Sequence, residues 1–272
     1  MTDTKQNQIE FPTITDISDQ LYRIIAGGFD RTFRNFLQGK ESVSRDGYFR
    51  FLSGLPHPIA NLLILRDPND AESLAEAVEP LCSDKFPSAV ICLGAVGGKM
   101  DESLQSRGFE FTERQLAMAI DLPNLTGTTI DNDFTIRQVG VDDHEQWVDV
   151  FAEGYELPRA FADRVGPARA ASITGTNAEY RYYIVFHHDR PVATALDIIR
   201  DGIVEVYNIS TVPEYRGRGI GRWVTGEPLR IARDEGYKTA ILQSSSQGVS
   251  VYRHLGFNSF GELPLYVRSP GC

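Results

Sequence analysis

Apolar and polar positions along this chain follow two periods, and the changes from one period to the other mark its predicted elements. In the first half, apolar residues recur at helical spacing from Ile14 to Ile25, since positions three and four apart share one face of a helix. Strand-like runs and further helical patterns follow. The elements predicted after the first helix are strands at residues 48–52, 59–65, 89–93 and 108–122, and helices at residues 70–81 and 100–107.

A second set of elements begins after residues 123–133, a segment rich in turn formers that is predicted to be a linker. Tight turns at Asp189-Arg190 and Asp201-Gly202 join three of the strands in this half. The predicted strands are residues 134–139, 180–187, 192–199, 203–212, 239–243, 257–260 and 265–268, and the predicted helices are residues 142–155, 158–173 with an interruption near Gly166, 219–234 and 248–255. This order predicts an α/β (α+β) fold in which helices flank a mixed central sheet.

Composition narrows the class of protein. The chain has 272 residues and a net charge of −10, which argues against binding along a nucleic-acid backbone, where Lys and Arg must neutralise phosphates. No apolar run approaches the roughly 20 residues of a membrane span, and the polar start shows no secretory signal. We therefore expect a cytoplasmic protein that does not bind membranes.

The cysteines and histidines do not predict a metal site. Cys82, Cys92 and Cys272 have no CxxC spacing, so neither a disulfide framework nor a zinc site is indicated. His187 and His188 are adjacent just before a predicted hairpin turn, and a solvated turn is the simpler interpretation. We assign no metal.

The most informative stretch is a strand that leads through three glycines, Gly217, Gly219 and Gly221, directly into a helix. Glycines allow a close approach of the backbone to a ligand, and a helix N-terminus offers free N–H groups to an anion. The loop therefore predicts a phosphate-binding site. Its spacing is neither GxGxxG nor a P-loop, and a glycine-rich turn without a ligand is the alternative.

The surrounding residues resemble one enzyme superfamily. Arg216-x-x-Gly219-x-Gly221 resembles the acetyl-CoA signature (Gln/Arg)-x-x-Gly-x-(Gly/Ala) of the GNAT N-acetyltransferases, and Val212-Pro-Glu-Tyr-Arg216 resembles its usual lead-in. About thirty residues later, Tyr252-Arg-His-Leu-Gly256-Phe257 resembles the Tyr-x-x-x-Gly-Phe element. The chain is similar to a bacterial subgroup with a diverged N-terminal half.

The resemblance implies a reaction in which an amine acceptor attacks the thioester of acetyl-CoA directly, moving an acetyl or short acyl group without a covalent enzyme intermediate. The alternative from a different class is a non-catalytic acyl-CoA sensor that retains the phosphate loop. A homodimer is a further possible assembly.

The resemblance also implies residues that bind the donor. It assigns the pyrophosphate to the loop amides, and the pantetheine to the edge of the preceding strand, as in β-strand addition. Arg216 and Arg218 would add charge, although Arg218 could equally be a solvated arginine. Ser245 stands where the family often has asparagine. The implied donor-binding residues are Ile209, Ser210, Thr211, Val212, Arg216, Gly217, Arg218, Gly219, Ile220, Gly221, Arg222 and Ser245.

Two residues are candidates for catalysis. Tyr252 matches the family's general acid, which protonates the leaving thiolate; the alternative is a core tyrosine. Glu205 lies eleven residues before Arg216, where the protein-acetylating branch carries its base. A solvated strand glutamate, or a water chain as the base, is the alternative. A β-bulge is expected in the strand of Glu205, as is usual in the superfamily. Candidate acceptor-site residues are Glu153, Tyr155 and Phe161.

The first half contains a weaker copy of the same pattern. Leu104-Gln-Ser-Arg-Gly108-Phe109 repeats the layout of the Tyr252–Phe257 element with leucine in place of tyrosine. Carboxylates in residues 66–70 stand where phosphates would bind, so this copy should not bind CoA. We therefore predict two tandem GNAT-like domains, a degenerate one at residues 1–125 and a catalytic one at residues 133–272. The first would serve packing or form one wall of the acceptor pocket.

Overall fold

The computed structural model describes residues 21–67, 71–94 and 96–270. None of the helices within these ranges combines the length and the apolar character that a membrane crossing requires. The first half consists of α2 (Leu21–Leu37), β1 (Ser42–Ser44), β2 (Tyr48–Leu52), the 3₁₀ turn η2 (Pro58–Ala60), β3 (Asn61–Leu65), α3 (Ala71–Ser83), β4 (Ser88–Cys92), α4 (Gly98–Gln105), β5 (Glu110–Asp121) and the 3₁₀ turn η3 (Leu122–Asn124).

The second half begins with a strand and a cluster of short helices, and then alternates strands and helices. Its elements are β6 (Phe134–Val139), η4 (Val141–Asp143), α5 (His144–Tyr155), α6 (Arg159–Ala162), η5 (Asp163–Val165), α7 (Pro167–Ala171), β7 (Ala178–His187), β8 (Arg190–Arg200), β9 (Ile203–Thr211), η6 (Pro213–Tyr215), α8 (Ile220–Asp234), β10 (Thr239–Ser244), α9 (Val249–Leu255) and β11 (Asn258–Arg268).

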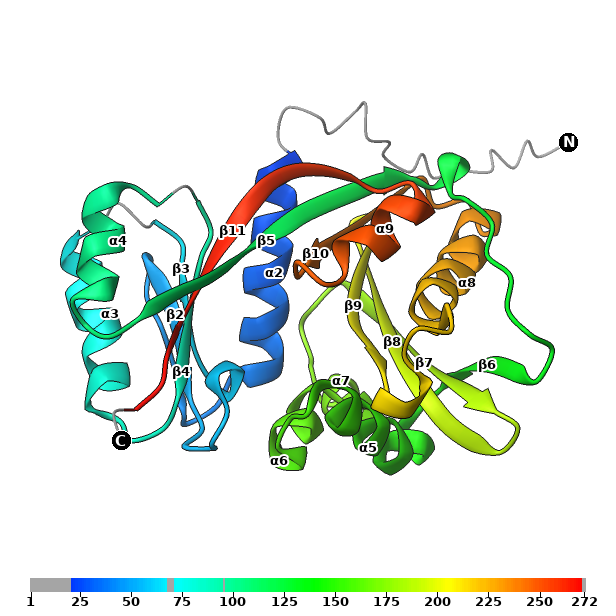
Figure 1. Ribbon diagram of the computed structural model, residues 1–272, viewed down its shortest axis with the longest axis horizontal. Helices are drawn as coiled ribbons and strands as arrows, with labels where there is room; N and C mark the ends of the chain where they lie inside the picture. Colours follow the sequence, from blue (N-terminus) through cyan, green and yellow to red (C-terminus); the bar gives the residue numbers. More distant parts are fainter. Residues whose placement is uncertain (1–20, 68–70, 95, 271–272) are drawn as a thin grey trace, which may run out of the picture.

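All the described strands join one mixed sheet in the order β1-β2-β3-β4-β11-β5-β10-β9-β8-β7-β6. The two central strands, β11 and β5, are exchanged between the halves. β11 follows the second half in sequence but pairs with β4, while β5 follows the first half but pairs with β10. In Figure 1 these two long strands run side by side from one lobe into the other.

The two halves contain similar units of strands and helices. β3–α3–β4–α4–β5 and β9–α8–β10–α9–β11 have the same order of elements, and in each the first two strands pair in parallel. In both units a glycine with positive φ follows the second helix: Gly108 (81°) comes after a short turn beyond α4, and Gly256 (105°) directly follows α9. The amides of Phe109 and Phe257 then donate to the carbonyls of Leu104 and Tyr252, at 3.1 and 3.0 Å. The repeat seen in the sequence therefore corresponds to a repeated supersecondary unit.

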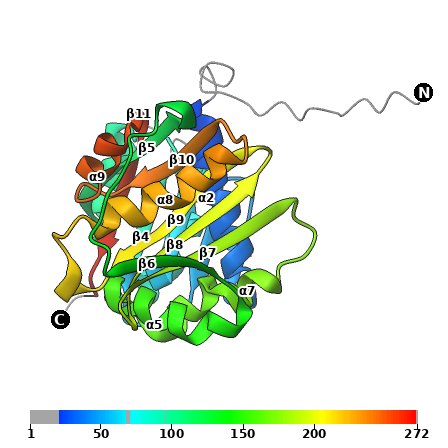
Figure 2. The same cartoon turned by 90° about the vertical axis from the view of Figure 1, so that its right-hand side faces the viewer.

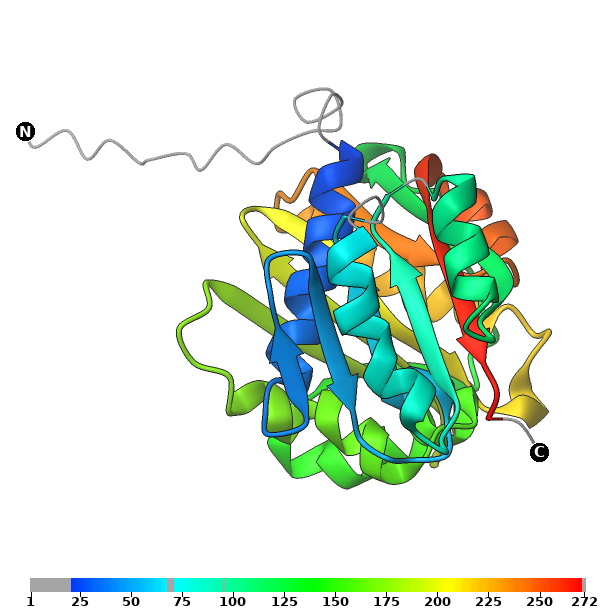
Figure 3. The same ribbon diagram turned by 90° about the vertical axis from the view of Figure 1, so that its left-hand side faces the viewer.

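The helices form two layers on the sheet. In the first half, α3 and α4 cover one face of the sheet (Figure 3). In the second half, α8 and α9 cover the same face of the sheet (Figures 1 and 2). On the opposite face, α2 and the α5–α7 cluster share one apolar core that extends under both halves. Because burial of apolar surface is the main favourable term in folding, this shared core couples the two halves.

Three sequence predictions need correction. The two strands predicted at residues 257–260 and 265–268 are one strand, β11, whose pairing with β5 shifts register at Ser259/Gly261 and Leu265/Tyr266. Gly261 and Pro264 are turn-type residues, but both pair with β5, and β4 joins β11 on the other side from Leu265 onward. The short strand β1 was not predicted. The first helix runs on to Leu37, and the predicted positions Ile14 and Ile17 lie outside the described residues.

Candidate functional site

The site lies where β9 and β10 separate. Their parallel pairing ends at Leu242 and Val206, although β9 continues to Thr211. The expected bulge is confirmed in β9: the pairing with β8 shifts between Thr194 and Leu196, and Asn208 has a φ of 53°. A separated strand edge of this kind leaves backbone groups free to pair with an extended ligand.

The glycine loop connects this strand edge to the N-terminus of α8. Gly217 and Gly219 have φ angles of 77° and 80°, where side chains are strained. A Cβ placed on Gly217, Gly219 or Gly221 would meet no atom within 4 Å. Beside the loop is a hollow of about 510 Å³. Thr211, Tyr215, Arg216, Gly217, Gly219, Ile220, Gly221, Arg222 and, from the α9 side, Gln247, Ser250, Val251 and His254 line it.

The two arginines of the loop are already engaged. Arg216 donates to the carbonyls of Gly154 at 2.7 Å and Thr211 at 3.2 Å, which ties the loop to the end of α5. Arg218 donates to the Glu214 carbonyl and lies over the Tyr215 ring, 4.8 Å from its centroid. The backbone amides of the loop and the α8 N-terminus are therefore the main groups presented to an anion here.

A second cavity of about 320 Å³ lies at the junction of the two halves. Its lining is aromatic, aliphatic or neutral polar. From the second half come Phe151, Tyr155, Leu157, Phe161, Val165, Val206, Tyr207, Asn208, Ile209, Gln243 and Tyr252; from the first half come Phe29, Phe33, His57, Ile59, Ile91 and Gln115. Ile209 lines this cavity, and Thr211 at the end of the same strand lines the hollow beside the glycine loop, so an extended ligand along β9 would reach both hollows.

Tyr252 and Tyr155 both line this cavity. Burial raises the pKa of Tyr252 well above its usual value, and the neighbouring Tyr155 raises it further. Desolvation also raises the pKa of Tyr155, to about 12, although 48% of that residue is exposed. Both hydroxyls are therefore protonated at neutral pH. A protonated hydroxyl is what a general acid must offer.

Glu205 lies one layer behind the cavity wall and is 2% exposed. Arg200 donates to its two oxygens at 2.8 and 2.9 Å. The hydroxyls of Tyr207 and Thr32 donate to Oε2 at 3.3 and 3.4 Å, and an Arg31 nitrogen lies 3.9 Å from Oε1. Burial raises the pKa of Glu205, while Arg200 and Arg31 oppose the rise. Tyr207 thus connects the cavity to a buried carboxylate.

Only some of the remaining predicted residues line either of the two hollows. Ser210 and Val212 are buried, and the Ser210 hydroxyl donates to the Val150 carbonyl at 3.3 Å. Ser245 is exposed and its carbonyl accepts from Gly248; it lines neither hollow. Of the candidate acceptor residues, Tyr155 and Phe161 line the cavity, whereas Glu153 is exposed and does not.

Sequence patterns did not identify the lining that comes from the first half. Phe29 and Phe33 lie on α2, with ring centroids 4.5 Å apart, and at helical spacing they are indistinguishable from ordinary core residues. His57 accepts a hydrogen bond from the Ile59 amide at 3.2 Å. None of these residues belongs to a motif, because they come to the cavity only through the packing of α2 and of the segment at η2 against the second half.

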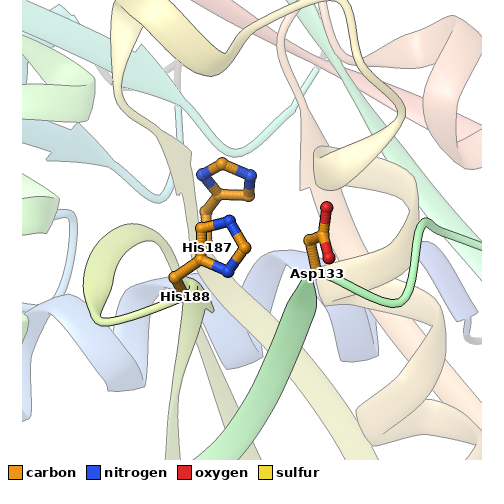
Figure 4. Close-up of side chains that lie close together, drawn as sticks. All are labelled: Asp133, His187 and His188. Atoms are coloured by element: carbon orange, nitrogen blue, oxygen red, sulfur yellow. The ribbon is translucent and has the colours of Figure 1, made fainter.

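A separate cluster on the surface contains Asp133, His187 and His188, whose ligand-type atoms all lie within 4.8 Å of one another. Figure 4 shows the two imidazoles together, with the Asp133 carboxylate on the neighbouring segment. The His187 Nδ1 lies 3.1 Å from the Tyr215 hydroxyl. The β6–β7 pairing places Asp133 beside the histidines, so no sequence spacing marks the group of three, and only the adjacent histidines stand out in the sequence.

The order of strand, glycine loop and helix, together with the separated strands, can be compared with known proteins. Residues 144–257 match the model of the acetyltransferase (GNAT) family. This stretch of the chain is similar to GNAT acetyltransferase domains. The match includes β9, the loop, α8 and the Tyr252–Phe257 element, so the superfamily resemblance drawn from the motifs is confirmed.

Curated relatives match a short part of this chain. A 72-residue stretch is 30% identical to human N-acetyltransferase 8B, and a 68-residue stretch is 34% identical to an uncharacterised protein of Mycobacterium leprae. Each match covers 25% of this chain, and the matched stretches span 32% and 19% of the two relatives. These matches are therefore too short to show the activity of the whole protein.

Solved structures resemble the whole GNAT-like architecture. A GCN5-related N-acetyltransferase from Kribbella flavida superposes with a TM-score of 0.61 at 17% identity, over 92% of this chain and 96% of that one. One from Sphaerobacter thermophilus gives 0.58 at 16% identity, over 95% and 94%. A tandem GNAT protein from the clavulanic acid biosynthesis pathway gives 0.53 at 10% identity, over 96% and 98%. At these identities the likeness shows the fold, and it confirms the predicted GNAT-like mixed sheet.

Proposed function

We propose that this protein transfers an acetyl or short acyl group from acetyl-CoA to an amine acceptor. The family match and the fold neighbours support acyl transfer as the class of reaction. The observation that carries the finer proposal is the geometry of two connected hollows: a glycine loop at the start of α8, and a cavity beside Tyr252 where β9 and β10 separate.

In this proposal the donor lies along the strand edge. The pyrophosphate binds the amides of the loop and of the first turn of α8, where the helix dipole favours negative charge. The pantetheine pairs with β9 from Ile209 to Val212, and the thioester enters the cavity. Arg216 contributes by holding the loop to α5. Ser245 has no contact with either hollow, so its proposed bond to the pantetheine depends on a shift of its loop.

The chemistry requires removal of one proton and delivery of another. As the amine attacks the thioester carbonyl, its proton passes to the Tyr207 oxygen while the Tyr207 proton moves to Glu205. The C–S bond then breaks, and Tyr252 protonates the departing thiolate. A buried carboxylate with a raised pKa is suited to accept a proton near neutral pH.

The domain arrangement belongs to the same proposal. We propose that residues 133–272 form the catalytic unit and residues 1–125 a degenerate copy that lacks a phosphate loop. The described part of the degenerate copy supplies α2 and one wall of the cavity. Strands β5 and β11 are exchanged between the units.

The test is calorimetric titration of the full chain with acetyl-CoA. We expect micromolar binding by the wild type and loss of binding in Gly219→Val, because a side chain at that position blocks the approach of the pyrophosphate to the backbone. Gly175→Val is the matched control: Gly175 also has a positive φ, 74°, and open surroundings, but lies outside both hollows.

The two variants share the same backbone strain, so a difference between them reports on the ligand. Equal binding by wild type and Gly219→Val would refute the assignment of the loop. Binding without acceptor-dependent release of CoA thiol, across a panel of amines, would instead favour the non-catalytic sensor.

A further inference from the structure

The charge of the residues that line the cavity beside Tyr252 limits which acceptors fit there. Among the described residues that line it there is no Asp, Glu, Lys or Arg. This contrasts with the chain as a whole, whose net charge of −10 would suit a polycation. Glu205, the carboxylate behind Tyr207, is already paired with Arg200. A ligand with several ammonium groups would therefore bury positive charge without a counter-ion, which is costly.

The wall supplied by the first half is apolar and aromatic. Phe29 and Phe33 on α2 form a tilted pair, and Phe161 from α6 lines the same cavity. Aromatic walls favour flat or branched apolar groups, because they bury large areas and stack with ring edges and faces. The cavity volume of about 320 Å³ is at the lower end of small-molecule sites, so the group that enters is small.

The polar groups of this wall are neutral. The Ile59 amide donates to the His57 Nδ1 at 3.2 Å, so the proton of the neutral ring is on Nε2. Burial lowers the pKa of His57 below its ordinary value, which favours that neutral form. Gln115 of β5 is the other polar residue from the first half. Together they can hydrogen-bond one uncharged polar group of a ligand, but they do not compensate a second charge.

We propose that the acceptor is a small primary amine on an uncharged, apolar and preferably aromatic body, which the aromatic wall of α2 recognises. The inference rests on the proposed acyl transfer and names its substrate class. It also gives the degenerate half a role, since residues of that half select the acceptor while the GNAT domain binds the donor.

The experiment compares acceptors by the release of CoA thiol from acetyl-CoA. The panel is 2-phenylethylamine, 3-methylbutylamine, spermidine, kanamycin and Nα-acetyl-lysine amide. We expect kcat/KM to be at least about tenfold higher for the two apolar amines than for the three polar or polycationic ones, since a desolvated unpaired charge discriminates at least as strongly as a missing methylene.

Two variants assign the preference to the α2 wall. Phe33→Asp should lower kcat/KM for 2-phenylethylamine about 10–100-fold, mainly through KM, and should leave the affinity for acetyl-CoA unchanged. Phe33→Ala, which adds no charge, should show a smaller loss in the same direction and remains informative if the aspartate variant folds poorly. The matched control is Phe111→Asp, which changes an aromatic residue that is 41% exposed and does not line the cavity.

The outcomes separate the two proposals. Faster turnover of spermidine, kanamycin or the lysine amide would overturn the acceptor class and leave acyl transfer intact. A Phe33→Asp effect on the use of butanoyl- or hexanoyl-CoA, with none on the choice of amine, would assign the cavity to the acyl chain and also overturn the inference. Binding of acetyl-CoA with no turnover of any amine would refute the enzyme itself.

Discussion

Burial changes the pKa values of individual side chains at this site. Tyrosine hydroxyls are already protonated at neutral pH, and desolvation raises the pKa values of Tyr252 and Tyr207 further above 10. Glu205 is buried beside Arg200, and desolvation raises its pKa while the guanidinium opposes the rise. The sequence motif identified Tyr252 and Glu205, but the hydrogen bond that links Glu205 to the cavity through Tyr207 depends on the bulged course of β9.

The first prediction concerns Tyr252→Phe. Removal of the hydroxyl takes away the proton donor for the thiolate and should lower kcat about 10²–10⁴-fold, with the affinity for acetyl-CoA nearly unchanged. Steady-state kinetics and calorimetry on the same preparation measure the two effects. The control is Tyr237→Phe, a tyrosine outside both hollows. An unchanged kcat in Tyr252→Phe would make this residue a packing residue.

The second prediction concerns Glu205→Gln. In the wild type, activity should rise with pH as Glu205 loses its proton, and the midpoint should lie above the usual glutamate value of 4.5 because burial raises the pKa. The glutamine variant cannot accept a proton, so kcat should fall and this limb of the pH–rate profile should disappear. Glu179→Gln, which changes an exposed carboxylate on β7, should retain the wild-type profile. A parallel drop at all pH values with the limb preserved would contradict the assignment.

At the scale of elements, the contact between α5 and β9 sets the position of the β9 edge that we propose binds the donor. Gly154, in the last turn of α5, has no side chain, and a Cβ there would lie 2.1 Å from the Ser210 hydroxyl and 3.2 Å from the Thr211 amide nitrogen. The Gly154 carbonyl also accepts a hydrogen bond from the Arg216 guanidinium. The end of α5 therefore holds both the β9 edge and the glycine loop.

The third prediction follows from this contact. Gly154→Ala should lower the free energy of unfolding by about 1–3 kcal/mol, because overpacking forces α5 and β9 apart, and should weaken the binding of acetyl-CoA. This is opposite in sign to the usual gain when alanine replaces glycine in a helix. Urea unfolding and calorimetry measure the two quantities. Gly140→Ala, where a Cβ meets no atom within 4 Å, is the control, and equal affinity in both variants would refute the proposed coupling.

Element prediction succeeded where periodicity and turn chemistry act locally. The helices and strands of the second half lie near their predicted positions, including the break at Gly166 before α7. The prediction separated β11 into two strands because Gly261 and Pro264 are poor strand residues. In the folded protein β5 pairs along most of β11, and β4 pairs with its last residues, Leu265–Arg268, on the other side.

At the scale of the whole molecule, a buried carboxylate makes stability depend on pH. Asp197 in β8 is 2% exposed, and its Oδ1 has no hydrogen-bond partner among the described residues. Burial raises its pKa to about 7, although Arg181 opposes the rise. In the unfolded chain the value is about 3.9. Because folding raises this pKa, the folded protein holds the proton more tightly than the unfolded chain does. The resulting contribution to stability is fully present at pH values below the unfolded pKa, and it is lost as the pH rises towards 7.

The fourth prediction uses Asp197→Asn. The variant has no proton to lose, so its free energy of unfolding should change less between pH 5 and pH 8 than that of the wild type. The difference should be about 2–4 kcal/mol, from about 1.4 kcal/mol for each pKa unit. Denaturant unfolding at both pH values measures it, with Asp189→Asn in the exposed turn as the control. Identical pH dependence in the wild type and Asp197→Asn would show that Asp197 ionises normally.

The sequence by itself determined the elements, the mixed fold, the glycine loop and the Tyr252 element, because these depend on local periodicity and on residues close together in the chain. It also revealed the repeated Gly-Phe pattern of the two halves. Only the tertiary structure decided that β5 and β11 exchange places, that α2 closes a cavity beside Tyr252, and that Glu205 is buried behind Tyr207. These features join residues such as Phe33 and Tyr252 that are far apart in sequence. Strand pairing and helix packing between distant segments leave no mark at a fixed spacing, since many alternative partners would satisfy the same apolar pattern.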